Sequence, residues 1–235
     1  MKIITGITLL LCLLVEVRGQ LPQRFGIISA SANSYKGDLS ATYKNWSSGV
    51  HVSMVLNKRK NWNGCFSLMF GNVVAQNADY VYDSGSVTSA TPNKFSNTSL
   101  VDISYQLRYY LLKKNCLWLY VYQGIGLLRF QPKDEQKKPL IDQLSTRPME
   151  ESYSNVSFQV PHGIGALYMW PQGYGAGIQA GYINSTSDYL DNISAWGMRK
   201  KTDNIFTVKF MFYFPIYGKT LKGTPDGASL PVEKL

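Results

Sequence analysis

A chain of 235 residues is long enough for one large domain, and its composition already excludes several classes of protein. Only 17% of the residues are charged, below the roughly 25% usual for soluble domains, so we expect something other than water to cover part of the surface. The 16 Tyr and 20 Gly favour β structure and exclude a helical bundle. The net charge of +9 makes the protein basic.

Residues 1–19 are expected to form a signal peptide. Lys2 supplies the positive start, Ile3–Val15 is apolar, and Gly19 precedes the expected cleavage point. The apolar stretch has about 13 residues, fewer than the roughly 20 that a spanning helix needs. Because the chain is predicted to leave the cytoplasm, we expect no nucleic-acid partner, and its basic charge suits an anionic membrane surface or an acidic protein.

Eight segments with alternating apolar and polar residues follow in chain order. In 101–111 the odd positions are apolar and nearly all even positions are polar, and in 206–214 four Phe and one Val share a face that we expect to meet lipid. Several segments reach the roughly 9–11 residues that a tilted strand needs to cross a bilayer. The eight predicted strands are 25–35, 47–57, 64–75, 101–111, 116–130, 153–170, 173–186 and 206–214.

The connections between these strands alternate in length. Short ones occupy 58–63, 113–115 and 170–173, whereas the others are long and polar, at 36–46, 76–97, 131–152 and 187–202. Outer-membrane barrels have short periplasmic turns and longer extracellular loops. The pattern therefore predicts an all-β fold, an eight-stranded antiparallel transmembrane β-barrel over 20–217 in the cell outer membrane, with 218–235 as a periplasmic C-terminal tail. A soluble β-sandwich with Gly at its bulges is the alternative.

Aromatic residues near the predicted strand ends fit the belts that Tyr and Trp form at membrane interfaces, although β-propensity alone also explains them. They are Tyr105, Tyr109, Tyr110, Trp118, Tyr120, Tyr122, Tyr168, Trp170, Tyr213 and Tyr217.

The lumen of an eight-stranded barrel is filled by its own side chains, which makes transport of large solutes implausible. Asp102, Arg108 and Lys209 fall on the inward faces of their strands, and we expect them to form an interior ionic network.

The short turns predict a periplasmic rim that could bind a partner. It is basic and aromatic and contains one thiol, with Lys58, Arg59, Lys60, Trp62, Lys113, Lys114, Cys116 and Trp170 as its members. Of the two cysteines that survive processing, Cys116 is next to a turn and is the better candidate for a crosslink to a partner. Pairing with Cys65, or two free thiols, remain open from the sequence.

No motif for catalysis or for a cofactor is present, so we expect neither an enzyme nor a resident metal. His51 and His162 lack metal-ligand spacing and are predicted to lie in the lumen or at the rim. Asp188 and Asp191, in the block Asp188-Tyr189-Leu190-Asp191-Asn192, could bind a cation, but a turn held by its own side chains is the favoured interpretation.

Four motifs resemble, in order and spacing, the PorG-like outer-membrane barrels of the bacterial type IX secretion system. They are Ser34-Tyr35-Lys36-Gly37-Asp38-Leu39, Gly124-Ile125-Gly126-Leu127-Leu128-Arg129-Phe130-Gln131-Pro132, Val160-Pro161-His162-Gly163-Ile164-Gly165, and Gly181-Tyr182 leading to Asp188-Tyr189-Leu190-Asp191-Asn192-Ile193-Ser194. The resemblance covers about residues 25 to 216. The chain departs from the family at Asn192, where a second Asp is usual, and at His162, where aromatic residues are usual.

This resemblance implies a non-enzymatic barrel, set among outer-membrane lipids, that contacts a periplasmic ring of a PorK-like lipoprotein and a PorN-like protein. Two other functions remain open from the residues. One is a stand-alone small barrel for adhesion or envelope integrity, which would act through its long loops. The other is a soluble secreted β-barrel that binds a small ligand inside.

Overall fold

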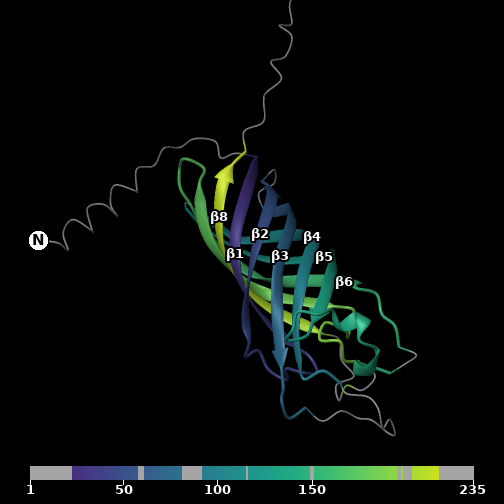
Figure 1. The fold of residues 1–235 in the computed structure, drawn as a ribbon. Helices are drawn as coiled ribbons and strands as arrows, with labels where there is room; N and C mark the ends of the chain where they lie inside the picture. The colour runs from purple at the N-terminus through teal and green to yellow at the C-terminus, as the bar shows by residue number, and fades with distance from the viewer. Residues whose placement is uncertain are drawn as a thin grey trace, which may run out of the picture.

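The computed structural model is a closed antiparallel barrel of eight strands, as the alternating segments predicted (Figure 1). It describes residues 23–57, 61–80, 92–114, 116–148, 151–194, 197 and 203–216. The predicted signal peptide 1–19 and tail 218–235 lie outside the described residues, as do Lys58, Arg59 and Lys60 of the predicted rim.

The strands are 11 to 20 residues long, and each pairs with its neighbours in sequence order. They are β1 (Arg24–Lys36), β2 (Trp46–Leu56), β3 (Trp62–Gln76), β4 (Phe95–Lys114), β5 (Leu117–Lys133), β6 (Val156–Met169), β7 (Gly175–Ser185) and β8 (Asn204–Pro215).

Pairing of the first strand with the last closes the sheet. β1 lies antiparallel to β8 with Ser29 opposite Met211, so neither strand presents an open edge. The short connections 57–61, 115–116 and 170–174 lie at one end, together with the start of β1 and the end of β8. The longer connections lie at the other end, which is lowermost in Figure 1. The predicted alternation of loop lengths is thereby confirmed, and we call the two ends the periplasmic end and the extracellular end.

The outer face of the barrel is apolar around its whole circumference. Each strand exposes large hydrophobic side chains at alternate positions, and Phe210 in the middle of β8 is 64% exposed. Examples from β1 to β8 are Ile28, Val52, Phe66, Ile103, Ile125, Phe158, Ile178 and Phe210. Exposed apolar surface of this extent is stable in lipid and costly in water. The protein is therefore an outer-membrane β-barrel.

The inner face is polar in its middle and apolar or aromatic towards both ends. Inward positions of the middle layer carry Ser, Asn, Gln, Thr and His side chains that are almost fully buried. Half of the aromatic residues expected at the membrane interface face this lumen instead. They are Tyr110, Trp118, Tyr120, Tyr122 and Tyr213. Their even or odd position along each strand, and not their distance from its end, decides which face they occupy.

Strand β4 begins six residues before the predicted start at 101. The added segment, 95–100, carries Ser96 and Thr98 on the buried inward face, and Asn97 and Ser99 follow Phe95 on the outward face. A strand that continues above the bilayer loses the lipid-facing apolar residues that reveal it in the sequence. Within the described part of the chain, helix is limited to the 3-10 turns Leu140–Asp142 and Leu144–Thr146, and no helix there could cross a bilayer.

Replacing Phe210 by Lys tests the lipid-facing assignment. We expect the substitution to destabilise the barrel in vesicles by about 2–4 kcal/mol, because it places a charge near the middle of the apolar band. Urea unfolding in lipid vesicles measures the change. The matched control is Glu135→Lys in an exposed loop, expected within about 0.5 kcal/mol of the parent. Equal stability of both variants would contradict membrane insertion.

Candidate functional site

Aromatic rings close the lumen at the periplasmic end. Phe25 packs edge-on against Trp118 and Tyr213, each with a ring-centroid distance of 6.5 Å, and Tyr110 packs perpendicular to Trp118 at 5.6 Å. These residues come from β1, β4, β5 and β8 and belong to one buried apolar cluster with Leu167 and others. Such edge-to-face packing is favourable beyond the area that it buries. The cluster blocks the lumen to solutes.

Arg108 lies directly above these rings in a cage of neutral groups. Its guanidinium donates to the Tyr213 hydroxyl at 3.0 Å and to Gln179 Oε1 at 3.4 Å, and it stands 4.9 Å from the centre of the Tyr120 ring. The Tyr120 hydroxyl also donates to Gln179 Oε1, at 2.8 Å. The charge is thus held by dipoles and a ring face, which suits the planar guanidinium.

Asp102 and Lys209 form a separate pair higher in the lumen. Both are buried and attract each other electrostatically, and Ser104 donates to Asp102 at 3.1 Å. His51 is buried in the same polar layer, with Nε2 at 3.0 Å from Ser31 Oγ. Within the described residues no direct ion pair joins either residue to Arg108. The three residues predicted to form an interior network therefore all lie in the lumen, where Lys209 is attracted by Asp102 and repelled by Arg108 without a direct salt bridge among the described residues.

Lys113 belongs as much to the aromatic closure as to the rim. Its ammonium group donates to Asn57 Oδ1 at 2.6 Å and lies 4.3 Å from the centre of the Trp118 ring. These contacts fold the side chain back over the mouth of the lumen. Lys114, the next residue, is exposed, so its charge faces solvent at this end.

The remaining rim residues differ in what they face. Trp62 stands on the outer face and packs on Tyr109 at 4.7 Å, an arrangement typical of the aromatic belt at a membrane interface. Trp170 lies half-buried in the β6–β7 turn. The two cysteines among the described residues are free: Cys65 is fully buried among the lumen rings, whereas Cys116 is partly exposed at the β4–β5 turn.

The extracellular mouth is closed by the loop 186–194, which we call the keystone loop. Asp191 accepts the backbone N–H groups of Leu39 at 2.9 Å and Ile193 at 3.1 Å, and Asp203 accepts that of Leu190 at 2.7 Å and the hydroxyl of Tyr35. The loop is therefore bonded to β1, to the β1–β2 connection and to the start of β8.

Asn192 extends these contacts to two further loops. Its backbone is left-handed, with φ of 70°, a conformation that Asn tolerates better than most residues. Its amide donates to Asn93 at 3.1 Å and to Thr146 at 2.9 Å, and accepts from the Tyr153 hydroxyl at 2.8 Å. Because Asn supplies both donors and an acceptor here, it performs a role that an Asp at this position could not fill alone.

Arg147 stiffens the β5–β6 loop beneath Tyr153. Its guanidinium donates to the carbonyl oxygens of Glu151, Leu140 and Ile141 at 2.9, 3.2 and 2.6 Å. The ring of Tyr153 stacks on Tyr189 of the keystone loop at 4.4 Å. Side chains of Leu39, Leu190 and Ile193 complete a buried apolar cluster under the loops. We call this whole assembly the extracellular cap.

Burial makes the carboxyl groups of the cap weak acids. It raises the pKa of Asp188 to about 7, with Asp38 and Asp191 adding to the effect. Burial likewise raises the pKa of Asp191 to about 6, although hydrogen bonds from backbone N–H groups oppose the shift. The pKa of Asp203 is raised well above its usual range by burial and by the neighbouring Asp191. The cap is thus an acidic cluster that favours bound protons.

The block predicted as a turn or a cation site is a turn. The Asn192 backbone N–H donates to the Tyr189 carbonyl, Asp191 accepts the backbone N–H of Ile193, and Asp188 accepts from the Ser194 hydroxyl. Within the described residues no group of three or more His, Cys, Asp or Glu side chains is placed to hold a metal ion. Sequence reasoning missed Asp203 and Arg147, since each acts on residues distant in the chain. It also misplaced His162, which lies on the outer face of β6 because its odd-numbered neighbours face the lumen.

Comparisons with known proteins identify the fold and nothing finer. No protein-family model matches the chain, and no curated protein matches it. The solved structure of Neisserial surface protein A is similar with a TM-score of 0.52 at 10% identity, over 83% of this chain and 97% of that one.

Two further solved structures are similar at lower scores. Ail, the attachment invasion locus protein of Yersinia pestis, gives 0.45 at 11% identity over 83% of this chain and 100% of that one. The outer membrane enzyme PagL gives 0.39 at 13% identity over 81% of this chain and 99% of that one. At these identities the likeness is one of fold.

Removing the Tyr213 hydroxyl tests the Arg108 cage. We expect Tyr213→Phe to lower the free energy of unfolding by about 1.5–3 kcal/mol, because a hydrogen bond to a buried charge is lost. Urea unfolding in vesicles measures it. Tyr105→Phe on the outer face serves as the control and should stay within about 0.5 kcal/mol. An unchanged free energy of unfolding in Tyr213→Phe would show that the stability of the buried Arg108 does not depend on this hydroxyl.

The acidic cap should loosen as the pH rises. Asp188 and Asp191 have raised pKa values in the closed cap and return towards 3.8 when it opens, so their protonated forms stabilise closure. That stabilisation is complete below about pH 4 and is lost as the pH rises through 6 to 7. Hydrogen exchange of the keystone-loop amides, corrected for intrinsic rates, should show stronger protection at about pH 5 than at about pH 8.

Asp188→Asn is the control for this experiment, because it removes one of the titrating groups and should shrink the pH difference. Protection that is equal at both pH values, or stronger at the higher one, would refute the assignment of these raised pKa values to the cap.

Proposed function

We propose that this protein is a non-conducting outer-membrane barrel that anchors a periplasmic ring of a type IX secretion machine. The partners would be a PorK-like lipoprotein and a PorN-like protein. The motifs shared with PorG-like barrels suggest this role, and the observation that carries it is the closure of the lumen at both ends. A barrel without a channel acts through its surfaces.

Closure at the periplasmic end supports a binding role over a transport role. The Phe25, Trp118 and Tyr213 rings fill the mouth, and Arg108 and Tyr120 fill the level above. None of these side chains lies on a loop that could swing aside, since all five come from strands. Opening would require rearrangement of the sheet itself.

The hydrogen bonds within and between the long extracellular loops favour the periplasmic end as the surface that binds a partner. Asn192 of the keystone loop donates to Thr146 of the β5–β6 loop, and Arg147 donates to backbone carbonyls within the β5–β6 loop itself. Loops specialised for capture of an external partner usually present such groups to solvent. The extracellular cap instead works as a lid that is bonded shut.

The periplasmic end offers basic charge, a thiol and an indole to a partner. Lys114 is exposed, Cys116 is partly exposed, and Trp170 lies in the adjoining turn. The basic run 58–60 lies outside the described residues, between Asn57 and Asn61 in the sequence. An acidic surface on the ring protein would complement this rim and would make association sensitive to salt.

One observation favours the stand-alone barrel as a second candidate. Leu144, in the otherwise well-bonded β5–β6 loop, is 61% exposed at the extracellular end. A stand-alone barrel would act through its long loops, and Leu144 would supply an apolar contact to a host or envelope surface. For this function, Leu144→Ser would impair activity in the cell, whereas reversing the charge of Lys114 would not.

Crosslinking through Cys116 separates the two functions. In intact membranes, a thiol-to-amine crosslinker should join Cys116 to a periplasmic lipoprotein that mass spectrometry identifies, and Cys116→Ser should abolish the product. Lys114→Glu should lower the yield several-fold at low salt, because it reverses the exposed charge beside the thiol.

The matched control places the reactive thiol at the other end. Ala41→Cys in the Cys116→Ser background puts an exposed thiol in the β1–β2 connection, where we expect no lipoprotein product. The same product from both positions would mean nonspecific capture. Absence of any product from Cys116, with the protein shown to be reactive towards a small thiol reagent, would argue against the ring-anchor function.

A further inference from the structure

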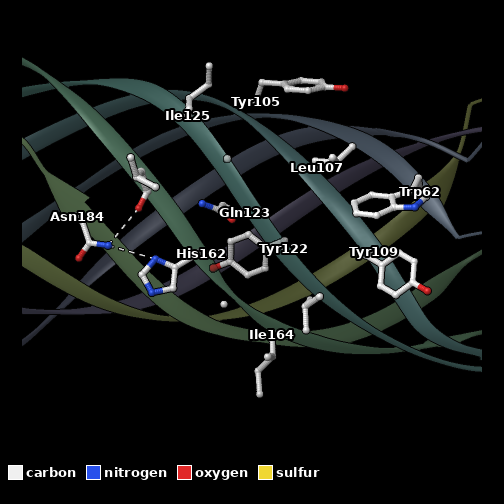
Figure 2. A pocket seen from close by; sticks show the side chains of 14 residues that line it. Trp62, Tyr105, Leu107, Tyr109, Tyr122, Gln123, Ile125, His162, Ile164 and Asn184 are labelled. Carbon is white, nitrogen blue, oxygen red and sulfur yellow. Dashed lines mark hydrogen bonds between the residues drawn. The ribbon is translucent and has the colours of Figure 1, made fainter.

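A groove of about 1140 Å³ crosses the outer face of the barrel over β3 to β7. Apolar side chains form most of its walls, among them Leu107, Ile125, Val160 and Ile164. Figure 2 shows His162 and Asn184 together at one end and Trp62 and Tyr109 at the other. Its volume slightly exceeds the roughly 300–1,000 Å³ typical of small-molecule sites, and it opens sideways into the lipid-facing band.

The regular sheet is interrupted beneath the groove. Gly163 and Gly181 lie opposite each other on β6 and β7, and a Cβ at Gly181 would come within 2.3 Å of the Tyr122 hydroxyl in the lumen. Pro161 has no N–H to give to a ladder, and the β5–β6 pairing skips from Gln123–His162 to Gly126–Gln159. The groove therefore lies over a close approach of β6 and β7 and a break in the β5–β6 ladder.

The floor carries three neutral polar side chains in an otherwise apolar face. They are Gln123, His162 and Asn184. The Asn184 amide nitrogen is 3.2 Å from His162 Nδ1 and donates at 3.5 Å to the Val160 carbonyl (Figure 2). Among the described residues, no protein group forms a hydrogen bond with His162 Nε2 or with the Gln123 side-chain amide. Polar groups in the lipid band are costly unless they have partners, and they often mark function.

The polar end of the groove leads towards the extracellular surface. Asn184 accepts a hydrogen bond from Asn204, which in turn accepts the Tyr43 hydroxyl at 2.6 Å. Tyr43 lies in the β1–β2 connection at the extracellular end. Trp62 and Tyr109, at the far end of the groove, lie near the periplasmic end of their strands. The groove therefore spans much of the apolar band, with its hydrogen-bonding groups on the extracellular side.

We propose that this groove binds one acyl chain of an extracellular-leaflet lipid. The chain would lie against Leu107, Ile125 and Ile164, and an ester, amide or hydroxyl oxygen near its head would bond His162 and Gln123. Among the described residues that line the groove there is no Lys, Arg, Asp or Glu, so the lining offers no opposite charge to a phosphate or a carboxylate. A neutral oxygen attached to a hydrocarbon chain matches both the walls and the floor.

Retention of lipid A tests the proposal, since its acyl chains carry ester, amide and hydroxyl oxygens. The full-length barrel would be reconstituted in phosphatidylcholine vesicles with added lipid A, extracted in mild detergent, and analysed by native mass spectrometry. We expect the parent to retain one lipid A. Val160→Trp, which fills the groove and so keeps the acyl chain from its walls and its oxygen from His162 and Gln123, should lower retention at least about tenfold, the factor that loss of one or two hydrogen bonds alone represents.

The control for bulk is Val52→Trp, the same substitution on the outer face of β2 away from the groove, which should retain lipid A as the parent does. His162→Leu with Asn184→Leu should also lower retention, whereas Asn72→Leu with Asn97→Leu, which removes another bonded amide pair from the described chain, should not. Val121→Trp replaces Val160→Trp if the latter does not fold.

Equal retention by Val160→Trp and Val52→Trp would overturn the proposal. So would equal retention of lipid A by the parent and by His162→Leu with Asn184→Leu, because the polar floor would then contribute nothing to binding. Co-purification of a protein segment in place of lipid, lost in Val160→Trp, would assign the groove to a protein partner and would equally refute the lipid.

Discussion

Eight strands closed into a barrel leave a lumen that only side chains can fill, and the rest of this structure follows from that limit. The outer face must be apolar to meet lipid, so the polar residues of each strand are turned inwards. There they need partners. Arg108 finds them in Tyr213 and Gln179, and Asp102 in Ser104 and the charge of Lys209. The lumen is therefore a polar core enclosed by a membrane-facing surface, the reverse of a soluble protein.

The two ends of the barrel are closed by different chemistry. At the periplasmic end the turns are short and supply little chain, so aromatic side chains from the strands fill the mouth. At the extracellular end the loops are long, and the keystone loop seals the mouth with Asp191, Asn192 and Leu190. The first closure has few groups that change charge near neutral pH, whereas the second depends on carboxyl groups whose pKa values burial has raised.

Because the lumen is closed at both ends, the protein can interact with other molecules only through its outer surfaces. The periplasmic rim offers Lys114 and Cys116 to a partner, and the outer wall offers a groove where Pro161 and paired glycines interrupt the regular sheet. These two surfaces lie in different media, one in the periplasm and one in lipid. A barrel that anchors a protein ring on one surface and holds a lipid on another would need no channel.

Alternation of apolar residues and of loop lengths was enough to predict eight strands, their closure and their lipid-facing side, because both depend on neighbours in the sequence. The inward positions of Asp102, Arg108 and Lys209 followed from the same period of two. Their partners did not, since Arg108 and Tyr213 meet across the lumen from strands about a hundred residues apart. Nor did the sequence place His162 on the outer wall, join Asp191 to Leu39, or reveal the groove. Those features arise only when closure brings distant strands and loops together, which is what the tertiary structure decided.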